Sequence, residues 1–317
     1  MSSAAQPEPT PGKGGAGGTA PREPVTLPEI ARMKAAGQPI VMVTAYDYPS
    51  ARIAEEAGVD LVLVGDTAAM VVLGYPGTEP VSMDEMVMLG RAVRRGLRTP
   101  LMVGDMPMGS YEASDELAVQ GAQRLVKETG CQAVKLESGG TSVDRARAIV
   151  RSGIPVIGHV GLTPQTATAL GGYKAQARTA DGAVKLREVA LALEKAGCFA
   201  IVFEAVPAAI TEAVAAELEV PTIGIGAGPS TDGQVLVFHD LVGLTTGPSP
   251  RFVKRYAGVY EEMVGAVSRY AEEVRACSFP GAEHLYSVEP AELAELTRRL
   301  ADDSLNSQAA WDWEPLP

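Results

Sequence analysis

The stretch Leu61-Val62-Leu63-Val64-Gly65-Asp66 is an apolar run that ends on an acidic residue. Continuous apolar strands of this kind suit a parallel sheet that is buried on both faces. Five further stretches repeat the pattern and end on an ionisable residue: 40–47, 101–105, 133–137, 156–159 and 200–204. In a parallel barrel, the residues at the strand ends gather on the face where chemistry is done. The repeated run therefore predicts both a parallel sheet and the face that carries the site.

Helices are expected between these strands, and glycines mark where several of them end. Gly58, Gly130 and Gly197 each follow a predicted helix, precede a strand, and stand seven or eight positions before its acidic end. A βα unit that is used several times favours one barrel over two separate domains. With two more strands expected at about 222–225 and 234–238, the sequence predicts an α/β fold of the (β/α)8 TIM barrel class.

The composition is that of a globular protein with a large core, because 46% of the 317 residues are hydrophobic and 21% are charged. The formal net charge of −12 argues against nucleic acid or an anionic membrane as a partner. Three cysteines without paired spacing fit a reduced protein. No apolar run approaches the roughly 18 residues of a membrane span. We therefore expect a cytoplasmic protein that binds neither nucleic acid nor membrane.

Three regions of different composition predict the domain organisation. Residues 1–22 are rich in Pro, Gly, Ala and Ser and cannot bury enough surface to offset their ordering entropy, so we expect disorder there. The catalytic barrel is expected to cover 23–287, including a helix at about 251–277 that closes the barrel and forms an assembly surface. Residues 288–317 are expected to form a C-terminal helix and a polar tail. Inside the barrel, the long segment 161–181 is predicted to be functional or mobile.

Acidic residues at neighbouring strand ends point to a hard metal ion. Asp66 and Asp105 end adjacent predicted strands, so their carboxylates can approach one cation, and Glu137 ends the next strand. Mg²⁺ is typically held by one or two carboxylates together with substrate oxygens and water. The alternative for either aspartate is a helix N-cap. Two such residues on neighbouring strands, with a third acid beside them, favour the metal site.

Glu204 ends the sixth strand, which lies opposite the second in an eight-stranded barrel. A carboxylate across the pocket from a metal can take a proton from a metal-bound carbonyl compound. The alternative is that Glu204 pairs with Lys135, which stands two positions before Glu137 and points into the barrel mouth with it. Lys135 could hold a substrate carboxylate, form a Schiff base or neutralise the acids, and the metal cluster favours charge stabilisation. For His159, two interpretations stay equally open: a residue of the site and a hydrogen-bonded core residue.

Seven motifs in order give the chain a family resemblance. They are 44–47 (TAYD), 64–67 (VGDT), 104–107 (GDMP), 134–137 (VKLE), 158–165 (GHVGLTPQ), 171–174 (GGYK) and 224–228 (GIGAG). On these motifs the chain resembles the ketopantoate hydroxymethyltransferase family, the first committed enzymes of pantothenate synthesis. The resemblance covers about residues 25–287.

The resemblance implies a barrel of the phosphoenolpyruvate/pyruvate superfamily, usually assembled as a homodecamer. It implies Mg²⁺ held through Asp66 and Asp105, with Glu137 in contact directly or through water. Glu204 would be the proton acceptor, and 5,10-methylenetetrahydrofolate would be the one-carbon donor that converts the substrate to ketopantoate. The substrate, 3-methyl-2-oxobutanoate (2-oxoisovalerate), would be bound by Asp66, Thr67, Asp105, Lys135 and His159.

The chain departs from the family pattern in one loop. Thr67 stands where Ser is more familiar, and Ala68-Ala69-Met70 replaces the usual Leu-Gly-Met. Threonine keeps the hydroxyl, so the change concerns only the tightness of the pocket. Two other classes of protein stay open. One is a Mg²⁺-dependent oxo-acid lyase or aldolase of the same superfamily that acts without folate, and the other is a non-catalytic metabolite-binding protein on the same barrel.

Overall fold

The computed structural model describes residues 22–247 and 249–303. The chain divides into two compact units, one that ends at Val259 and one that begins at Tyr260. This boundary lies before residue 287, where the sequence placed the end of the barrel domain. The two units are described separately below.

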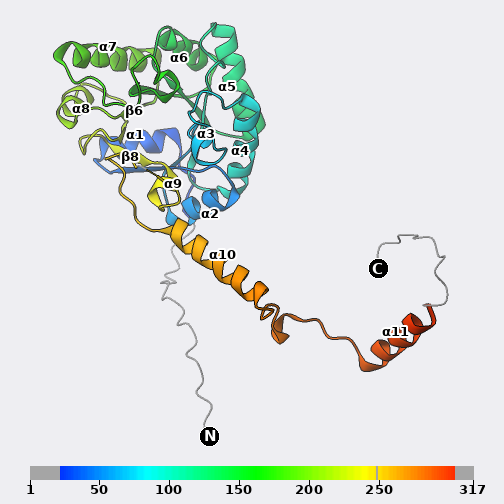
Figure 1. The fold of residues 1–317 in the computed structure, drawn as a ribbon. Coiled ribbons are helices and arrows are strands. Elements are labelled where there is room, and N and C mark those ends of the chain that lie inside the picture. The colour runs from blue at the N-terminus through cyan, green and yellow to red at the C-terminus, as the bar shows by residue number, and fades with distance from the viewer. Residues whose placement is uncertain (1–21, 248, 304–317) are drawn as a thin grey trace. The chain divides into compact units, whose positions relative to one another are not determined.

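The first unit contains a closed parallel barrel in which eight strands pair in sequence order and β8 pairs with β1 (Figure 1). This confirms the predicted (β/α)8 class. Seven of the strands have the predicted beginning or end, and β5 continues past His159 to Gly161. The strands are β1 Ile40–Thr44, β2 Leu61–Val64, β3 Leu101–Asp105, β4 Ala133–Glu137, β5 Val156–Gly161, β6 Ala200–Glu204, β7 Thr222–Ile225 and β8 Gly233–Leu236.

Helices surround the barrel, and their ends follow the capping residues of the sequence. Ser82 and Glu85 form a reciprocal capping box at the start of α4. Gly58, Gly130 and Gly197 end α2, α5 and α7 with positive φ angles of 72°, 76° and 98°, a conformation that favours glycine. The helices of this unit are α1 Leu27–Ala35, α2 Tyr48–Ala57, α3 Ala68–Val71, α4 Met83–Gly96, α5 Asp115–Thr129, α6 Ser142–Arg151, α7 Ala180–Ala196, α8 Ala208–Ala215 and α9 Phe238–Leu241.

Alternation along the strands separates two apolar clusters and aims the polar ends inward. Leu61 and Leu63 of β2 belong to the cluster inside the barrel, whereas Val62 and Val64 pack outward against the helices. The inward cluster also includes the residues two positions before Asp105, Lys135, His159 and Glu204, which are Val103, Ala133, Ile157 and Val202. Because side chains alternate with a period of two, Asp105, Lys135, His159 and Glu204 are directed to the same inner side.

The last part of this unit in sequence differs from the prediction in two places, the end of β8 and the start of the helix after it. Strand β8 ends at Leu236, because the backbone N–H of Phe238 donates to Thr44 Oγ1 at 2.8 Å and α9 begins there. The helix predicted from residue 251 begins only at Val259. In the preceding segment, Tyr256 N–H donates to Leu241 O and Val259 N–H to Val242 O, so this backbone pairs with α9 before α10 begins.

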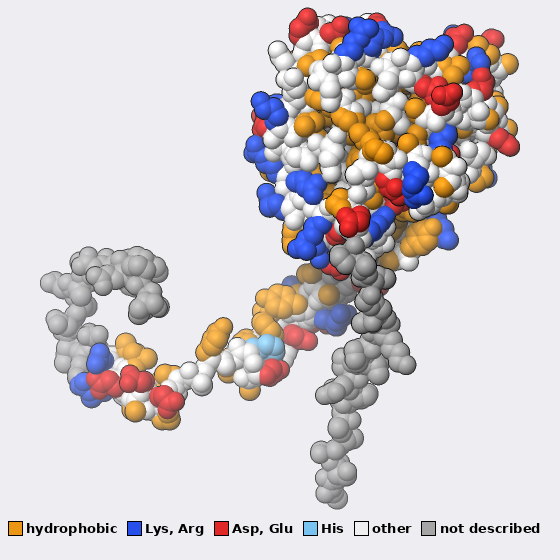
Figure 2. All heavy atoms as spheres, turned by 180° about the vertical axis from the view of Figure 1, so that it is seen from behind, with side chains coloured by type: hydrophobic (Ala, Val, Ile, Leu, Met, Phe, Trp, Pro, Cys, Tyr) orange, Lys and Arg blue, Asp and Glu red, His pale blue; other side chains and the backbone are white. Residues whose placement is uncertain are grey.

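Helix α10, Val259–Arg275, belongs to the second unit from Tyr260 onward. This unit also contains α11, Pro290–Asp303, which confirms the helix predicted in 288–317. No described residue of α10 is buried. Apolar side chains are visible on this unit in Figure 2, and those exposed on α10 recur three or four positions apart: Tyr260, Met263, Val264, Val267, Tyr270 and Val274. The end of the predicted polar tail, with Trp311 and Trp313, lies outside the described residues.

The predicted disordered segment 1–22 also lies outside the described residues, except for Arg22. Arg22 pairs with the side chain of Asp60 and donates to Val59 O at 2.8 Å. Across 22–247 and 249–303, no helix is both long enough and apolar enough to cross a membrane.

Candidate active site

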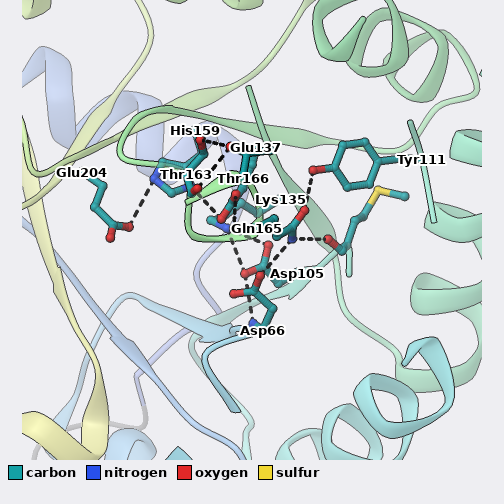
Figure 3. A network of polar contacts seen from close by, with 11 residues as sticks. Asp66, Asp105, Tyr111, Lys135, Glu137, His159, Thr163, Gln165, Thr166 and Glu204 are labelled. Carbon is teal, nitrogen blue, oxygen red and sulfur yellow. Dashed lines mark hydrogen bonds and ion pairs between the residues drawn. The ribbon is translucent and has the colours of Figure 1, made fainter. Parts of the chain in front are cut away.

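Three buried carboxylates lie at the C-terminal ends of consecutive strands, as the sequence predicted (Figure 3). Asp105 and Glu137 are the last residues of β3 and β4, and Asp66 lies two residues after β2. Burial of three acids in one place is unfavourable unless hydrogen bonds or opposite charges compensate for it. The compensation comes from the side chain of Lys135 and from both the side chain and the backbone N–H of Gln165.

Lys135 is the positive charge of the site, and it pairs with Asp105. Its Nζ donates to Asp105 Oδ1 at 2.7 Å and to Oδ2 at 2.9 Å. Residues 105 and 135 are direct partners in the β3–β4 register, which explains why Lys135 pairs with Asp105. The alternative in which Lys135 pairs with Glu204 is therefore wrong.

The charge of Lys135 is maintained by its neighbours. Burial alone would lower the pKa of the ammonium group, but Asp105 and Asp66 outweigh it and the pKa is raised. A Schiff base requires a neutral amine. The environment of Lys135 thus favours a fixed positive charge over covalent chemistry.

Asp66 is not a helix N-cap. Helix α3 begins at Ala68 after Thr67, whose side chain makes no capping hydrogen bond, and Thr67 itself is partly exposed. Asp66 Oδ2 accepts from Gln165 Nε2 at 2.9 Å, and its backbone N–H donates to Asp105 Oδ2 at 3.1 Å. Burial and the charge of Asp105 raise the pKa of Asp66 to about 7, against the opposing effects of Lys135 and Gln165.

Glu137 and His159 form the next layer of the site. Glu137 Oε2 accepts from the backbone N–H of Gln165 at 3.0 Å, while Oε1 is buried without a hydrogen bond in the described part of the chain. His159 Nδ1 lies 3.7 Å from this Oε1 atom, because the two residues are partners in the β4–β5 register. Burial, with the charge of Asp66, raises the pKa of Glu137 well above its usual value.

His159 connects this layer to Glu204. Its Nε2 lies 3.3 Å from Glu204 Oε2, although the described residues give neither ring nitrogen a well-aligned hydrogen bond. Burial and the charge of Lys135 lower the pKa of His159, although Glu204 opposes them, and this favours the neutral imidazole. His159 is therefore a member of the polar network as well as a buried residue.

Glu204 is the most accessible of these acids. Its side chain is 17% exposed, whereas that of its neighbour His159 is 1% exposed. In Figure 3 Glu204 lies on the far side of His159 from Asp66 and Asp105. The geometry thus gives one end of the site a buried acid pair and the other an acid that a bound molecule can reach.

Two residues of the network received no role from the sequence. Gln165 contacts Asp66 and Glu137, and Tyr111 donates from its hydroxyl to Gln165 Oε1 at 2.7 Å. Gln165 ends the motif 158–165 and lies in the segment predicted to be functional, so the sequence contained a signal for it. Tyr111 lies in the loop after β3, and nothing in its local sequence distinguished it.

The residues at this site fit a hard divalent cation. Across the described residues, no three His, Cys, Asp or Glu side chains converge as ligands of one ion. The adjacent carboxylates of Asp66 and Asp105 nevertheless supply the one or two carboxylates that Mg²⁺ requires, since water and substrate oxygens complete its shell. The unpartnered Oε1 of Glu137 is available to such an ion, directly or through a water. A site for zinc would require at least three protein ligands and more nitrogen or sulfur.

A cavity of about 750 Å³ lies away from this network. It is formed around the beginnings of β1 and β8. Its charged residues, Lys34 and Asp232, are already paired at 3.1 Å. The strand C-termini therefore remain the candidate site.

Two solved structures of other proteins share this fold. Phosphonopyruvate hydrolase, solved with oxalate and Mg²⁺, is 14% identical with a TM-score of 0.55, covering 89% of this chain and 99% of its own. The 2,3-dimethylmalate lyase, a member of the PEP mutase/isocitrate lyase superfamily, is 18% identical with a TM-score of 0.54, covering 88% and 98%. At these identities the likeness shows only that this chain shares its fold with both proteins.

Closer relatives identify the family. The sequence profile described as Ketopantoate hydroxymethyltransferase matches residues 24–282. The 3-methyl-2-oxobutanoate hydroxymethyltransferase of Moorella thermoacetica is 52% identical over 267 residues, which cover 84% of this chain and 99% of the relative. That of Thermus thermophilus is 53% identical over 252 residues, covering 80% and 96%. The chain belongs to the ketopantoate hydroxymethyltransferase family and is a transferase.

Proposed function

We propose that this enzyme transfers a hydroxymethyl group from 5,10-methylenetetrahydrofolate to 3-methyl-2-oxobutanoate and forms ketopantoate, in the pathway to pantothenate, with Mg²⁺ as cofactor. The observation that carries the proposal is the division of the site between a buried acid pair and an accessible acid. Removal of a proton beside a carbonyl group requires both electrostatic stabilisation of the carbonyl oxygen and a base that reaches the carbon.

The acid pair would hold the metal. Asp66 and Asp105 are the proposed ligands, with Glu137 near enough to act through water. Bound Mg²⁺ supplies Lewis-acid polarisation of the oxo acid. Lys135 keeps its positive charge between these acids and can stabilise negative charge that develops on the substrate. Thr67, beside Asp66, would complete the substrate site.

Glu204 would be the base that takes the proton from C3 of the oxo acid. His159 Nε2 lies 3.3 Å from Glu204 Oε2, so the neutral imidazole can orient the carboxylate without removing its charge. The resulting carbon nucleophile attacks the methylene carbon of the folate, and one water is consumed as tetrahydrofolate leaves.

A second candidate is a Mg²⁺-dependent oxo-acid lyase or aldolase that acts without folate. The similarity in fold to 2,3-dimethylmalate lyase favours it. Such an enzyme would use the same acids and the same base. Cleavage of a hydroxy oxo acid in buffer without folate would distinguish it. A protein that only binds the oxo acid would show no exchange of its C3 proton.

The experiment that tests the proposal is NMR of 3-methyl-2-oxobutanoate in D₂O with the enzyme. Mg²⁺, chelator and then methylenetetrahydrofolate are added in turn. We expect C3 exchange that requires Mg²⁺, followed by ketopantoate formation when the folate is added. Exchange without transfer would contradict the folate donor, and the absence of exchange would contradict the mechanism.

Two accompanying features are part of the proposal. We propose a homo-oligomer, a decamer by family resemblance, and the exposed apolar residues of α10 support association because surfaces of this kind mark contact sites. Light scattering after size exclusion would measure the mass, and a monomer would contradict it. We also propose a cytoplasmic location, which agrees with the free state of Cys131, Cys198 and Cys277.

A further inference from the structure

Gln165 follows β5 and contacts residues at the ends of three other strands of the site. It lies in the short 3-10 turn Pro164–Thr166 that follows β5. Its Nε2 donates to Asp66 Oδ2 and to Met106 O, both at 2.9 Å, and its backbone N–H donates to Glu137 Oε2 at 3.0 Å. One buried residue thus binds the segments that follow β2 and β3 and the end of β4.

The orientation of the Gln165 side chain is fixed by chemistry. Both partners of Nε2 are acceptors, a carboxylate oxygen and a backbone carbonyl, so the NH₂ group must face them. The remaining atom, Oε1, must then accept, and the hydroxyl of Tyr111 donates to it at 2.7 Å. Burial raises the pKa of Tyr111, so this hydroxyl keeps its proton.

The turn that carries Gln165 is itself held in place. Thr163 Oγ1 and Thr166 Oγ1 lie 2.6 Å apart, and Thr166 N–H donates to Thr163 O at 3.0 Å. Pro164 stands at the first position of the turn, where its fixed φ is already suitable. The donors of Gln165 are therefore directed at the two acids before any ligand arrives.

We infer that Gln165, with its amide locked by Tyr111, is a positioning residue that determines which carboxylate oxygens of Asp66 and Glu137 face the metal and the substrate. The inference rests on the proposed function of this site. By holding Oδ2 of Asp66 and Oε2 of Glu137, Gln165 leaves Oδ1 and Oε1 free of hydrogen bonds within the described residues. Partners of metal-binding carboxylates typically contribute about 10- to 100-fold to metal affinity or activity.

The test replaces the amide while keeping the length of the side chain. Gln165→Met removes both side-chain donors, and Tyr111→Phe removes only the hydroxyl that locks the amide. The control is Gln132→Met, because Gln132 directly precedes β4 at the opposite end of the barrel, where its Oε1 accepts from Met102 N–H at 2.9 Å. For each variant we measure Mg²⁺ affinity by calorimetry without substrate, kcat and KM for 3-methyl-2-oxobutanoate, and the melting temperature.

We expect Gln165→Met to weaken Mg²⁺ binding about 10- to 100-fold and to lower kcat by a similar factor. Tyr111→Phe should weaken Mg²⁺ binding roughly 3- to 10-fold, the usual effect of one buried hydrogen bond. Gln132→Met should change the melting temperature without changing Mg²⁺ affinity.

The failure of this inference can be distinguished from the failure of the proposed function. Wild-type enzyme that shows no Mg²⁺-dependent exchange of the C3 proton would contradict the proposed function. An active wild type whose Gln165→Met variant binds Mg²⁺ equally well would overturn the positioning role alone. Should Gln165→Met not fold, Tyr111→Phe decides, and unchanged Mg²⁺ affinity in that variant would overturn the inference.

Discussion

Asp105 and Glu204 occupy equivalent places, at the last residues of β3 and β6, yet their surroundings differ. Asp105 is buried, and both of its oxygens accept from Lys135. Glu204 is partly exposed and faces a neutral imidazole at 3.3 Å. The bidentate contact with Lys135 fixes the orientation of the Asp105 carboxylate, and a fixed orientation is what a metal ligand requires. A carboxylate beside a neutral group keeps its lone pairs available, which is what a base requires. In the proposed function, the barrel would thus separate metal binding from proton transfer by the partner that each of these two carboxylates meets.

The largest expected effect comes from replacing Glu204, the proposed base. Glu204→Gln should lower kcat about 10²- to 10⁴-fold, the usual contribution of a general base. Binding of 3-methyl-2-oxobutanoate should persist, because Asp105 and Lys135 are unchanged. Steady-state kinetics and calorimetry measure the two quantities. Glu212→Gln, an exposed substitution on α8, is the control. Unchanged turnover in Glu204→Gln would remove Glu204 as the base.

Removing Lys135, the partner of the proposed metal ligand Asp105, should reduce the stability of the protein. Lys135→Met leaves Asp105 as an unpaired buried charge, which should lower the free energy of unfolding by about 3–5 kcal/mol without Mg²⁺. Added Mg²⁺ should restore part of it. Urea unfolding with and without Mg²⁺ measures both. Lys34→Met breaks the 3.1 Å pair with Asp232 at the other end of the barrel, so Mg²⁺ should give no rescue there. Equal rescue of both variants would contradict the assignment.

Asp66, the other proposed metal ligand, should also make Mg²⁺ binding depend on pH. The pKa of Asp66 is raised to about 7 from its ordinary value of 3.8, and Mg²⁺ binds the deprotonated form. Mg²⁺ affinity should therefore fall about tenfold for each pH unit below 7.

The same pKa shift fixes the sign of the effect on stability without metal. Because the pKa is higher in the folded state, protonation of Asp66 favours folding. This contribution is complete below pH 3.8 and is lost as the pH rises through 7. Thermal unfolding at pH 6 and pH 8 should therefore show the larger Mg²⁺-induced shift at pH 8. A larger shift at pH 6 would contradict this.

The smallest expected effect concerns the departure from the family at Thr67. Thr67→Ser keeps the hydroxyl beside Asp66 and should change kcat/KM by no more than about twofold, as substitutions at such partly exposed positions do. Thr67→Val, which removes the hydroxyl and keeps the shape, should cost about tenfold if that group binds substrate. Kinetics of the two variants side by side would show whether the hydroxyl or the methyl group matters. Equal values would exclude a role for the hydroxyl.

Much of the barrel could be predicted because its signals are local. The apolar run Leu61–Val64 and its repeats define buried strands without knowledge of their neighbours. Glycines such as Gly58 mark helix ends, since only glycine adopts a positive φ without strain. Strand β8 ends before the residue that the sequence predicts, because the backbone N–H of Phe238 donates to Thr44, a residue 194 positions earlier in the chain. No local pattern contains such a contact.

By itself, the sequence determined which residues stand at the strand ends and that they point inward, because side chains alternate with a period of two along a strand. Only the tertiary structure decided how they pair. Neighbouring strands are staggered, so Asp105 lies beside Lys135 and not beside Glu137. The same stagger places Glu137 beside His159. Gln165 joined the site for another reason, because the turn after β5 folds back over the ends of β2, β3 and β4.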